Sequence, residues 1–514
     1  METTTSYSEK IAQQLAGLSP AKRALLELRL MKKQAAGTAK RVIPRRANRE
    51  VAPLSYNQQG LWVLNQLMPG TSLYHTPMAV RLTGVLNVTA LERALNSIVA
   101  RHDALRTTFT TLEGTPSQVI ASEALLELPL IDLSSELDTE REPAAQRLLQ
   151  HEARRPFELS LGPLVRSILV RLSEQEHILL VTMHHIVTDG WSVGIFQREL
   201  SELYKGFATG DEATLPELPI QYLDYAAWQR RWFAGELYES QLAYWKKIFA
   251  PLPPVLELPT DHPRPNAQAH RAFRGVHQTI CLSKQLTTDL KLLSQRQGAT
   301  LFMTLLAAYE ILLQRYSGED DIVVGTPIAG RQMPETEGLI GLFINTLPLR
   351  TSLSGDPSFR EVLGRVKEAA LGAYANQDLP FERLVKELQP ERTLAHNPLF
   401  QVMFVLQSEE ISPLQLPGLI IEHFRLGNTM ANFDLTLDVV ERDGQLVCLF
   451  ESNADLFESD TVARLMGHFQ TLLESIIANP EQKISSLPLL TDVERRQLLV
   501  EWNDTQTDYP NQKT

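Results

Sequence analysis

Residues 183–192, with the sequence MHHIVTDGWS, hold the side chains whose types and spacing best suit chemistry. His184 and His185 are adjacent, and Asp189 follows four residues after His185, directly before Gly190. An imidazole exchanges protons near neutral pH, and a carboxylate at this reach could orient it or pair with a distant arginine. A buried structural histidine is the ordinary alternative. A zinc site is not expected, because no cysteine pair or histidine-rich segment accompanies these residues.

This stretch lies between a predicted strand and a predicted helix. Residues 177–183 are almost wholly apolar, which is typical of a strand buried on both faces. Ser192 or Asp189 could cap the helix that follows. Its apolar residues recur at helical spacing: Val193, Phe196, Leu200, Leu203 and Phe207. Side chains alternate along a strand, so only one of the two histidines can face a given pocket, and the other would serve packing.

Length and composition bound the class of protein. The chain has 514 residues, too many for one compact core, so two domains or lobes are expected. The net charge of −12 argues against nucleic acid as the main partner. No apolar run is long enough to span a membrane, and no signal-peptide core is present. Cys281 and Cys448 are too isolated for a disulfide framework, so we expect a cytoplasmic, reducing location.

Composition also suggests five parts. Residues 1–50 read as an N-terminal helix, over residues 11–31, and a basic linker; the helix either caps the main body or docks a partner protein. Residues 51–250 form a first lobe, and a proline-rich linker is predicted over residues 251–270. Residues 271–490 form a second lobe, and residues 491–514 begin another linker. Mixed helices and strands in both halves predict a pseudo-twofold α/β protein that binds ligands in the crevice between its lobes.

Seven patterns, in the same order along the chain, resemble the motifs of the condensation domain of nonribosomal peptide synthetases. The resemblance runs from about Ser55 to the C-terminus, with Asn57 where alanine is usual and Asp103 where glutamate is common. The end of the chain, EWNDTQTDYP, resembles the linker that leads into an adenylation domain. The matching stretches are LSYNQQGLWVL (54–64), RHDALRTTF (101–109), HHIVTDG (184–190), YLDYAAW (222–228), IGLFINTLPLR (340–350), NQDLPFE (376–382) and, more loosely, ERTLAHNPL (391–399).

The resemblance implies a fold and a reaction. The expected fold is α/β, with two chloramphenicol-acetyltransferase-like lobes that form a V-shaped pseudodimer with a tunnel between them. Phosphopantetheine arms of carrier proteins, or a coenzyme A thioester, would enter as substrates, with no covalently bound cofactor and no metal. The domain would transfer an acyl or peptidyl group from a donor thioester to the amine of an aminoacyl thioester. The acceptor would be held by a downstream peptidyl carrier protein, beside an adenylation domain in the same native chain.

The resemblance also assigns roles to individual residues. His185 would accept the proton of the amine or hold the amine by a hydrogen bond, and these two roles stay open. His184 and Asp189 would be structural, with Arg350 as the expected partner of Asp189. Gly190 would let the backbone approach the pantetheine arm or the thioester closely.

Three further residues are candidates for support of the site. Asn345 and Trp191 would line the tunnel or position a substrate. Arg106 would support the residues of the site without itself contacting the substrate.

Three rival functions share part of this pattern. An epimerisation domain carries the same histidine motif, but DGWS and the adenylation-type linker favour condensation. A non-catalytic recruitment domain usually has a damaged motif, which is intact here. The linker also argues against a free-standing acyltransferase that uses coenzyme A thioesters.

The donor is a separate question. Because the sequence begins at Met1 with no fused carrier before the first motif, we expect the donor to come from another protein or to be a free acyl thioester. Of an initiating, fatty-acyl role and an in-trans peptidyl role, the few charges of the N-terminal helix favour the first.

Overall fold

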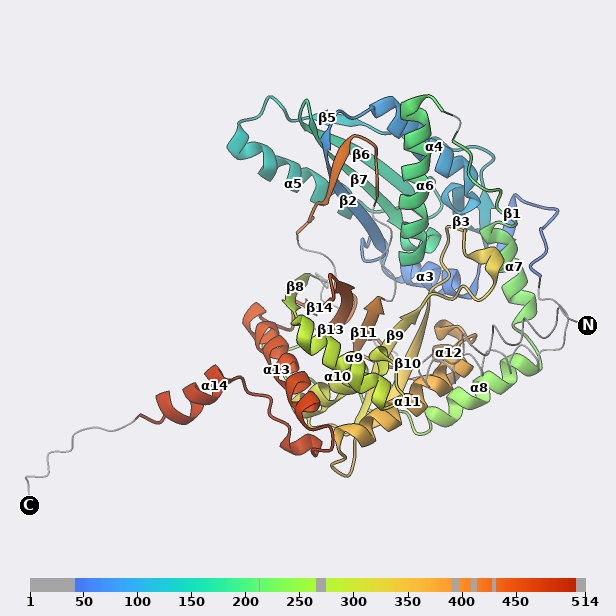
Figure 1. Cartoon of the computed structure of the whole chain (residues 1–514). Coiled ribbons are helices and arrows are strands. Elements are labelled where there is room, and N and C mark those ends of the chain that lie inside the picture. The colour runs from blue at the N-terminus through green and yellow to red at the C-terminus, as the bar shows by residue number, and fades with distance from the viewer. Residues whose placement is uncertain are drawn as a thin grey trace, which may run out of the picture.

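The computed structural model describes residues 42–211, 213–264, 274–390, 397–407, 414–427 and 431–504, and it shows two lobes stacked one above the other (Figure 1). The helix predicted over residues 11–31 lies outside these ranges, as do residues 391–396 of the last motif. Within the described ranges, every helix is too short or too polar to cross a lipid bilayer.

The N-terminal lobe is built on a five-stranded sheet with the strand order β12-β2-β7-β6-β5. Helices α4 (Val88–Arg101) and α6 (Gly190–Thr209) pack on one face, and α5 (Asp138–Arg154) covers the other (Figure 1). All residues of β7 from His177 onward are buried, so the predicted strand covered on both faces is confirmed. The five strands are β12 (Leu419–His423), β2 (His75–Gly84), β7 (Glu176–His184), β6 (Val165–Ser173) and β5 (Leu130–Asp132).

Smaller elements complete the N-terminal lobe and its junction with the other lobe. A three-stranded sheet has the order β1-β4-β3. Two successive helices, α7 and α8, are separated by a turn at Gly235, whose φ of +67° favours glycine. The elements are β1 (Val51–Pro53), α3 (Tyr56–Leu67), β3 (Thr107–Leu112), β4 (Thr115–Ile120), α7 (Tyr222–Trp232) and α8 (Glu236–Ile248).

The C-terminal lobe is built on a six-stranded sheet with the strand order β10-β9-β11-β13-β14-β8. Its strands are β8 (Gly275–Cys281), β9 (Asp321–Ile328), β10 (Asn345–Ser352), β11 (Val402–Gln407), β13 (Leu435–Arg442) and β14 (Gln445–Asn453). Its helices are α9 (Lys284–Arg296), α10 (Leu301–Ser317), α11 (Phe359–Ala375), α12 (Phe381–Leu388) and α13 (Ser459–Ala478). The apolar run LFMTLLAAYEILL makes α10 buried through most of its length, as a helix at the centre of a lobe must be.

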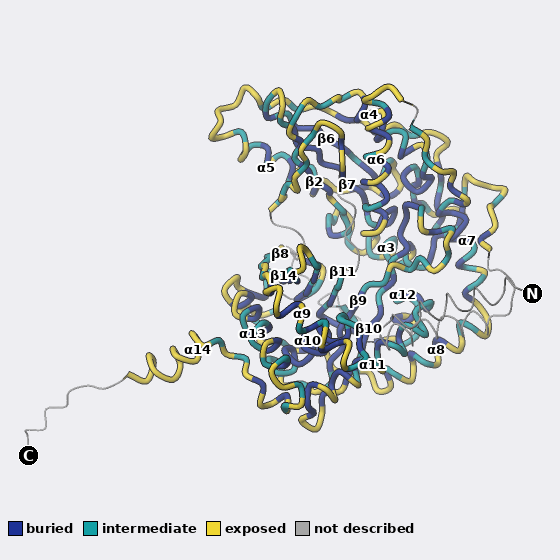
Figure 2. The backbone as a smooth tube through the Cα atoms, in the orientation of Figure 1, coloured by how far each residue is buried: buried dark blue, intermediate teal, exposed yellow. Residues whose placement is uncertain are grey.

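Two further stretches correspond to the predicted linkers. Residues 251–264 contain no helix or strand and lie along the C-terminal lobe, where the Leu256 backbone N–H donates to Gln401 at 2.9 Å. After α13, a short helix, α14 (Asp492–Arg496), projects from the C-terminal lobe, and none of its residues is buried (Figure 2). The assignment of residues 251–270 and 491–514 as linkers stays a prediction, and residues 265–270 lie outside the described ranges.

The two lobes are not formed from continuous stretches of the chain. Strand β12, from the C-terminal half, pairs antiparallel with β2 and completes the N-terminal sheet. Residues 330–344, which we call the crossing segment, leave the C-terminal lobe between β9 and β10 and pack against α7. The predicted division into residues 51–250 and 271–490 therefore misses two exchanges between the lobes.

Glycine at position 341 permits the contact between the crossing segment and α7. A Cβ atom at Gly341 would lie 2.0 Å from the ring of Tyr222, which is itself buried. The Tyr222 hydroxyl donates to the backbone oxygen of Leu342 at 2.7 Å, so the ring cannot move aside without loss of that bond.

We expect Gly341→Ala to lower the free energy of unfolding by about 1–3 kcal/mol, as overpacking does in a tight core. Gly364→Ala is the matched control, because Gly364 is exposed within α11 and a Cβ atom there would meet no atom within 4 Å. There alanine should be neutral or stabilising, by up to about 1 kcal/mol. Urea denaturation of both variants checks this, and equal effects would contradict the close contact.

Candidate active site

The histidine motif lies on the turn between β7 and α6. Strand β7 ends at His184, and residues 185–187 form one turn of 3₁₀ helix. Asp189 is the N-cap of α6, where its side chain accepts the backbone N–H of Ser192 at 2.8 Å. The strand therefore stops between the two histidines, and the turn places them in different surroundings.

His184 is buried in the N-terminal lobe. Its Nδ1 accepts the backbone N–H of Ile186 at 3.1 Å, so its proton is on Nε2. Its ring meets those of His75 and Phe157 edge-on, with centroids 6.0 and 6.1 Å away. Burial, with the neighbouring His75 and His185, lowers the pKa of His184 to about 3. His184 is therefore a neutral imidazole that is packed on its neighbours.

His185 is only partly buried, and its hydrogen bonds define its tautomer. Its backbone N–H donates to the Tyr74 oxygen at 2.7 Å, which ties the turn to the start of β2. Its Nδ1 lies 2.6 Å from the backbone oxygen of Thr188. A carbonyl oxygen can only accept, so Nδ1 carries the proton and Nε2 keeps its lone pair. This is the tautomer that can accept a proton, or a hydrogen bond, at Nε2.

Asp189 joins the turn to the C-terminal half of the chain. Its Oδ1 accepts the Ser192 hydroxyl at 2.7 Å and Arg331 Nη2 at 3.2 Å. Its Oδ2 accepts the backbone N–H groups of Phe343 and Ile344 at 2.8 and 3.2 Å. The side chains of Asp189 and Arg331 are 2% and 1% exposed, so this is a buried ion pair whose carboxylate is fully hydrogen-bonded.

The expected pair of Asp189 and Arg350 is wrong. Arg350 instead contacts Asp321 on β9, with Nη2 and Oδ2 2.7 Å apart, and donates to the backbone oxygens of Ile248 and Pro251. Arg350 lies five residues beyond the start of β10, which at the rise of a strand carries it about 17 Å from the crossing segment.

Arg331, which pairs with Asp189, is a residue of this arrangement that the sequence did not reveal. It lies in GRQMPE, which matches none of the motifs. A signal in the sequence is the arginine directly after Gly330, two residues beyond the end of β9. Gly330 has a φ of +66°, and a Cβ there would lie 1.9 Å from the Phe343 oxygen, so the two ends of the crossing segment touch.

Asn345 and Trp191 both hold loops in place. The Asn345 side chain donates to the backbone oxygens of Gln377 and Leu379 at 3.0 and 2.9 Å and accepts the Phe381 N–H at 3.0 Å. It thus fixes the loop before α12. Trp191 is 40% exposed, and its Nε1 donates to the Glu337 oxygen at 3.1 Å, which ties α6 to the crossing segment.

Gly190 and Arg106 complete the predicted set. Gly190 is exposed at the first position of α6, and a Cβ there would meet no atom within 4 Å. Arg106 bonds the Asp103 carboxylate at 2.6 Å and the backbone oxygens of Val99 and Ser122 at 3.1 Å each. The hydrogen bonds of Arg106 thus connect elements of the N-terminal lobe, and none of them involves the histidine motif.

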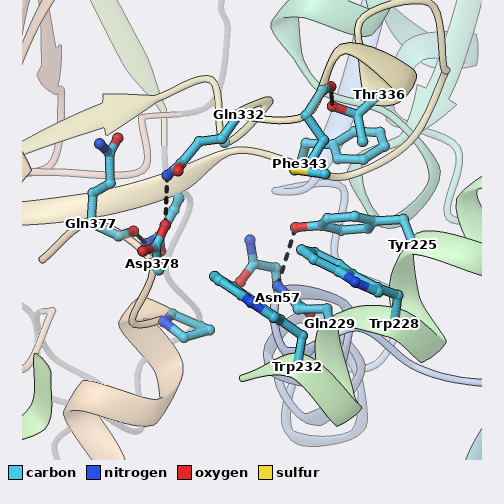
Figure 3. Close-up of a pocket in the computed structure, with 14 residues that line it drawn as sticks. Asn57, Tyr225, Trp228, Gln229, Trp232, Gln332, Thr336, Phe343, Gln377 and Asp378 are labelled. Atoms are coloured by element: carbon cyan, nitrogen blue, oxygen red, sulfur yellow. Dashed lines mark hydrogen bonds between the residues drawn. The ribbon is translucent and has the colours of Figure 1, made fainter. Parts of the chain in front are cut away.

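A small cavity lies beside the crossing segment, which contributes Gly330, Gln332, Met333, Thr336 and Phe343 to its lining (Figure 3). The indoles of Trp228 and Trp232 stack along one wall, with centroids 4.8 Å apart, and Tyr225, Phe343 and Asp378 contribute to the others. Its volume is about 50 Å³. Ligand pockets typically measure about 300–1,000 Å³, so this space is too small to admit a pantetheine arm.

Comparisons with known proteins agree with this geometry. The profile of the condensation-domain family matches residues 48–499. A subunit of linear gramicidin synthase from Brevibacillus parabrevis is 51% identical over 463 residues, which cover 90% of this chain and 9% of that protein. The chain therefore spans under a tenth of the length of this relative.

Solved structures show the same fold. The X-domain from teicoplanin biosynthesis is 30% identical with a TM-score of 0.79, over 88% of this chain and all of that domain (100%). The starter condensation domain of rhizomide synthetase, in complex with C8-CoA and Leu-SNAC, is 22% identical with a TM-score of 0.73, over 86% of this chain and 98% of its own.

The chain belongs to the condensation-domain family of nonribosomal peptide synthetases, whose members are amide-forming acyltransferases. The predicted α/β fold with two chloramphenicol-acetyltransferase-like lobes is confirmed.

The buried ion pair predicts a specific pattern of coupling. Asp189→Ala and Arg331→Ala should each cost roughly 3–5 kcal/mol of stability, because each leaves the other charge buried and uncompensated. The double variant should cost much less than the sum. Asp189→Ala with Arg350→Ala should be additive. Thermal or urea unfolding of the singles and doubles checks this, and additivity for Asp189 with Arg331 would contradict the pairing.

Proposed function

We propose that this domain transfers an acyl or peptidyl group from a donor thioester to the amine of an aminoacyl thioester on a downstream carrier protein. The observation that carries the proposal is His185, whose Nδ1 proton is held by Thr188 while Nε2 is available as an acceptor. The amine nitrogen attacks the thioester carbonyl, the C–S bond breaks, and an amide forms. His185 Nε2 accepts a proton of the amine, and the leaving sulfur takes up a proton as the thiol.

The energetics suit this simple machinery. Aminolysis of a thioester is downhill, so the domain mainly has to hold two reactants together. Good orientation is worth roughly 7–11 kcal/mol of the barrier, and general-base help adds about 10²–10⁴-fold. An α-amine has a reference pKa of roughly 7.7–8.0, so a usable neutral fraction exists near pH 7.

The other residues of the motif have supporting roles in this proposal. Gly190 offers an exposed backbone, free of a side chain, past which a pantetheine arm or thioester can run. His184, Asp189 and Arg331 hold the turn, while Trp191 and Asn345 hold the loops around it. Both arms would reach His185 through a tunnel between the lobes, delivered by carrier proteins that work beside an adenylation domain in the cytoplasm.

For the donor, we favour an aminoacyl or peptidyl carrier protein. The relatives that align over at least 90% of this chain include a subunit of linear gramicidin synthase and a synthetase that is named for a tripeptide, phosphinothricin tripeptide synthetase. An initiating role with a fatty acyl donor is the second candidate, because the starter domain of rhizomide synthetase was solved with C8-CoA. A peptidyl donor has a polar backbone that the donor side of the tunnel must accommodate, whereas a fatty acyl donor has none.

A recruitment role is the main non-catalytic alternative, because the X-domain that shares this fold was solved in complex with OxyB. The intact His185, with its tautomer set for proton or hydrogen-bond acceptance, favours catalysis.

We expect His185→Ala to lower the rate of amide formation by about 10²–10⁴-fold without unfolding the domain. His185→Gln can accept a hydrogen bond but not a proton, so it separates the two roles left open by the sequence. A low rate in both variants indicates a base, and retention of the rate in the glutamine variant indicates positioning. Mass spectrometry of the acceptor carrier, loaded and sampled over time, measures both. Wild-type rates in folded His185→Ala would contradict the proposal.

We expect the domain to use an aminoacyl- or peptidyl-carrier donor faster than a fatty acyl-carrier or an acyl-coenzyme A. The experiment offers all the donors in parallel to one loaded acceptor carrier and follows its intact mass. Efficient use of the fatty acyl donors alone would establish the initiating role instead. Absence of transfer from every donor would favour recruitment.

A further inference from the structure

His102 links the N-terminal lobe to the crossing segment through a wholly buried imidazole. It follows the last residue of α4 and is 1% exposed. Its Nε2 lies 2.9 Å from the Glu199 carboxylate on α6. Its Nδ1 accepts the backbone N–H of Ile340, in the crossing segment, at 3.3 Å.

Glu199 determines which nitrogen of His102 carries the proton. Burial alone would raise the pKa of the Glu199 carboxyl, but His102 and Arg101 together hold it below its ordinary value. Arg101 Nε contacts the other carboxylate oxygen at 3.1 Å. An ionised carboxylate can only accept hydrogen bonds, so the His102 proton is on Nε2. The lone pair on Nδ1 is then directed at Ile340, as the bond to its N–H requires.

Ile340 is the first of five consecutive residues that side chains of the N-terminal lobe hold by their backbone groups. Ser192 Oγ, whose own proton goes to Asp189, accepts the backbone N–H of Gly341 at 3.1 Å. Tyr222 then binds Leu342, and Asp189 binds the next two residues. Since the backbone between these bonds is short, a shift at Ile340 moves the donors that hold Asp189.

We propose that His102 is a positioning residue for the reaction: its tautomer, set by Glu199, fixes the register of the crossing segment on Asp189 and thereby the turn that carries His185. The part of this inference that concerns rate rests on the proposed function. The part that concerns the crossing segment does not, and it has its own measurement.

Two substitutions of His102 separate its two hydrogen bonds. The amide of asparagine lies near the position of Nδ1, so His102→Asn can still accept the Ile340 N–H but cannot reach Glu199. The amide of glutamine lies near Nε2, so His102→Gln can still donate to Glu199 but loses Ile340. Both variants place one amide in the same buried site, and a loss that came from stability alone would affect them alike.

The first measurement is hydrogen–deuterium exchange of a peptide that contains residues 339–345, in the full chain. We expect faster exchange in His102→Gln and near wild-type exchange in His102→Asn. The second is the rate of amide formation with loaded carriers. Since a displacement of about 1 Å can cost on the order of 10²-fold, His102→Gln should lower kcat by up to that factor with little change in KM. His102→Asn should retain most of kcat.

Glu199 supplies an independent check. Glu199→Gln keeps an acceptor for the His102 Nε2 proton and should leave exchange and kcat near wild type. Glu199→Leu removes this acceptor, so the imidazole of His102 is free to carry its proton on Nδ1, opposite the Ile340 N–H. This variant should therefore behave like His102→Gln.

Several outcomes would overturn the inference. They are wild-type exchange and kcat in His102→Gln, equal losses in the asparagine and glutamine variants, or wild-type behaviour in Glu199→Leu. If the wild-type domain forms no amide with any donor, the proposed function fails, and the exchange rates alone then decide whether His102 positions the crossing segment.

Discussion

The carboxylate of Asp189 is the group on which the arrangement of the two lobes depends. A buried charge is tolerated only when it is paired and its lone pairs are satisfied, and here five donors come from both halves of the chain. The same side chain caps α6, so the geometry of the turn and the position of the crossing segment are not independent. Loss of any one donor leaves the others attached to an undercompensated charge.

This dependence explains why the residues of the motif are so close in sequence yet differ in role. His184 is neutral and packed, Asp189 is charged and paired, and His185 alone combines partial exposure with a free lone pair. His184 and Asp189 thus hold the turn that carries His185 in one conformation. Such a division fits a reaction that is already downhill, where orientation contributes more than proton transfer.

The sequence predicted the local features well and the long-range ones poorly. Apolar periodicity located β7 and α6, and Asp189 was the correct one of two candidates for the cap, because these signals lie within a few neighbouring residues. Arg350 is the partner that the motifs predict for Asp189, because it lies in one of them. The actual partner, Arg331, lies outside every motif. Nothing in periodicity reveals that β12 pairs with β2, since pairing of distant strands is decided by the whole fold.

The position of β12 in the N-terminal sheet has a consequence for how the chain is made. Strand β2 ends at Gly84, but its outer neighbour begins only at Leu419, so the ribosome synthesises four of the six strands of the C-terminal sheet before that edge is covered. In the meantime β2 presents unpaired backbone groups, which are a template for wrong pairing. Until β12 is synthesised, the sheet of the nascent N-terminal lobe lacks one edge strand, and chaperones that shield exposed strand edges can act on it.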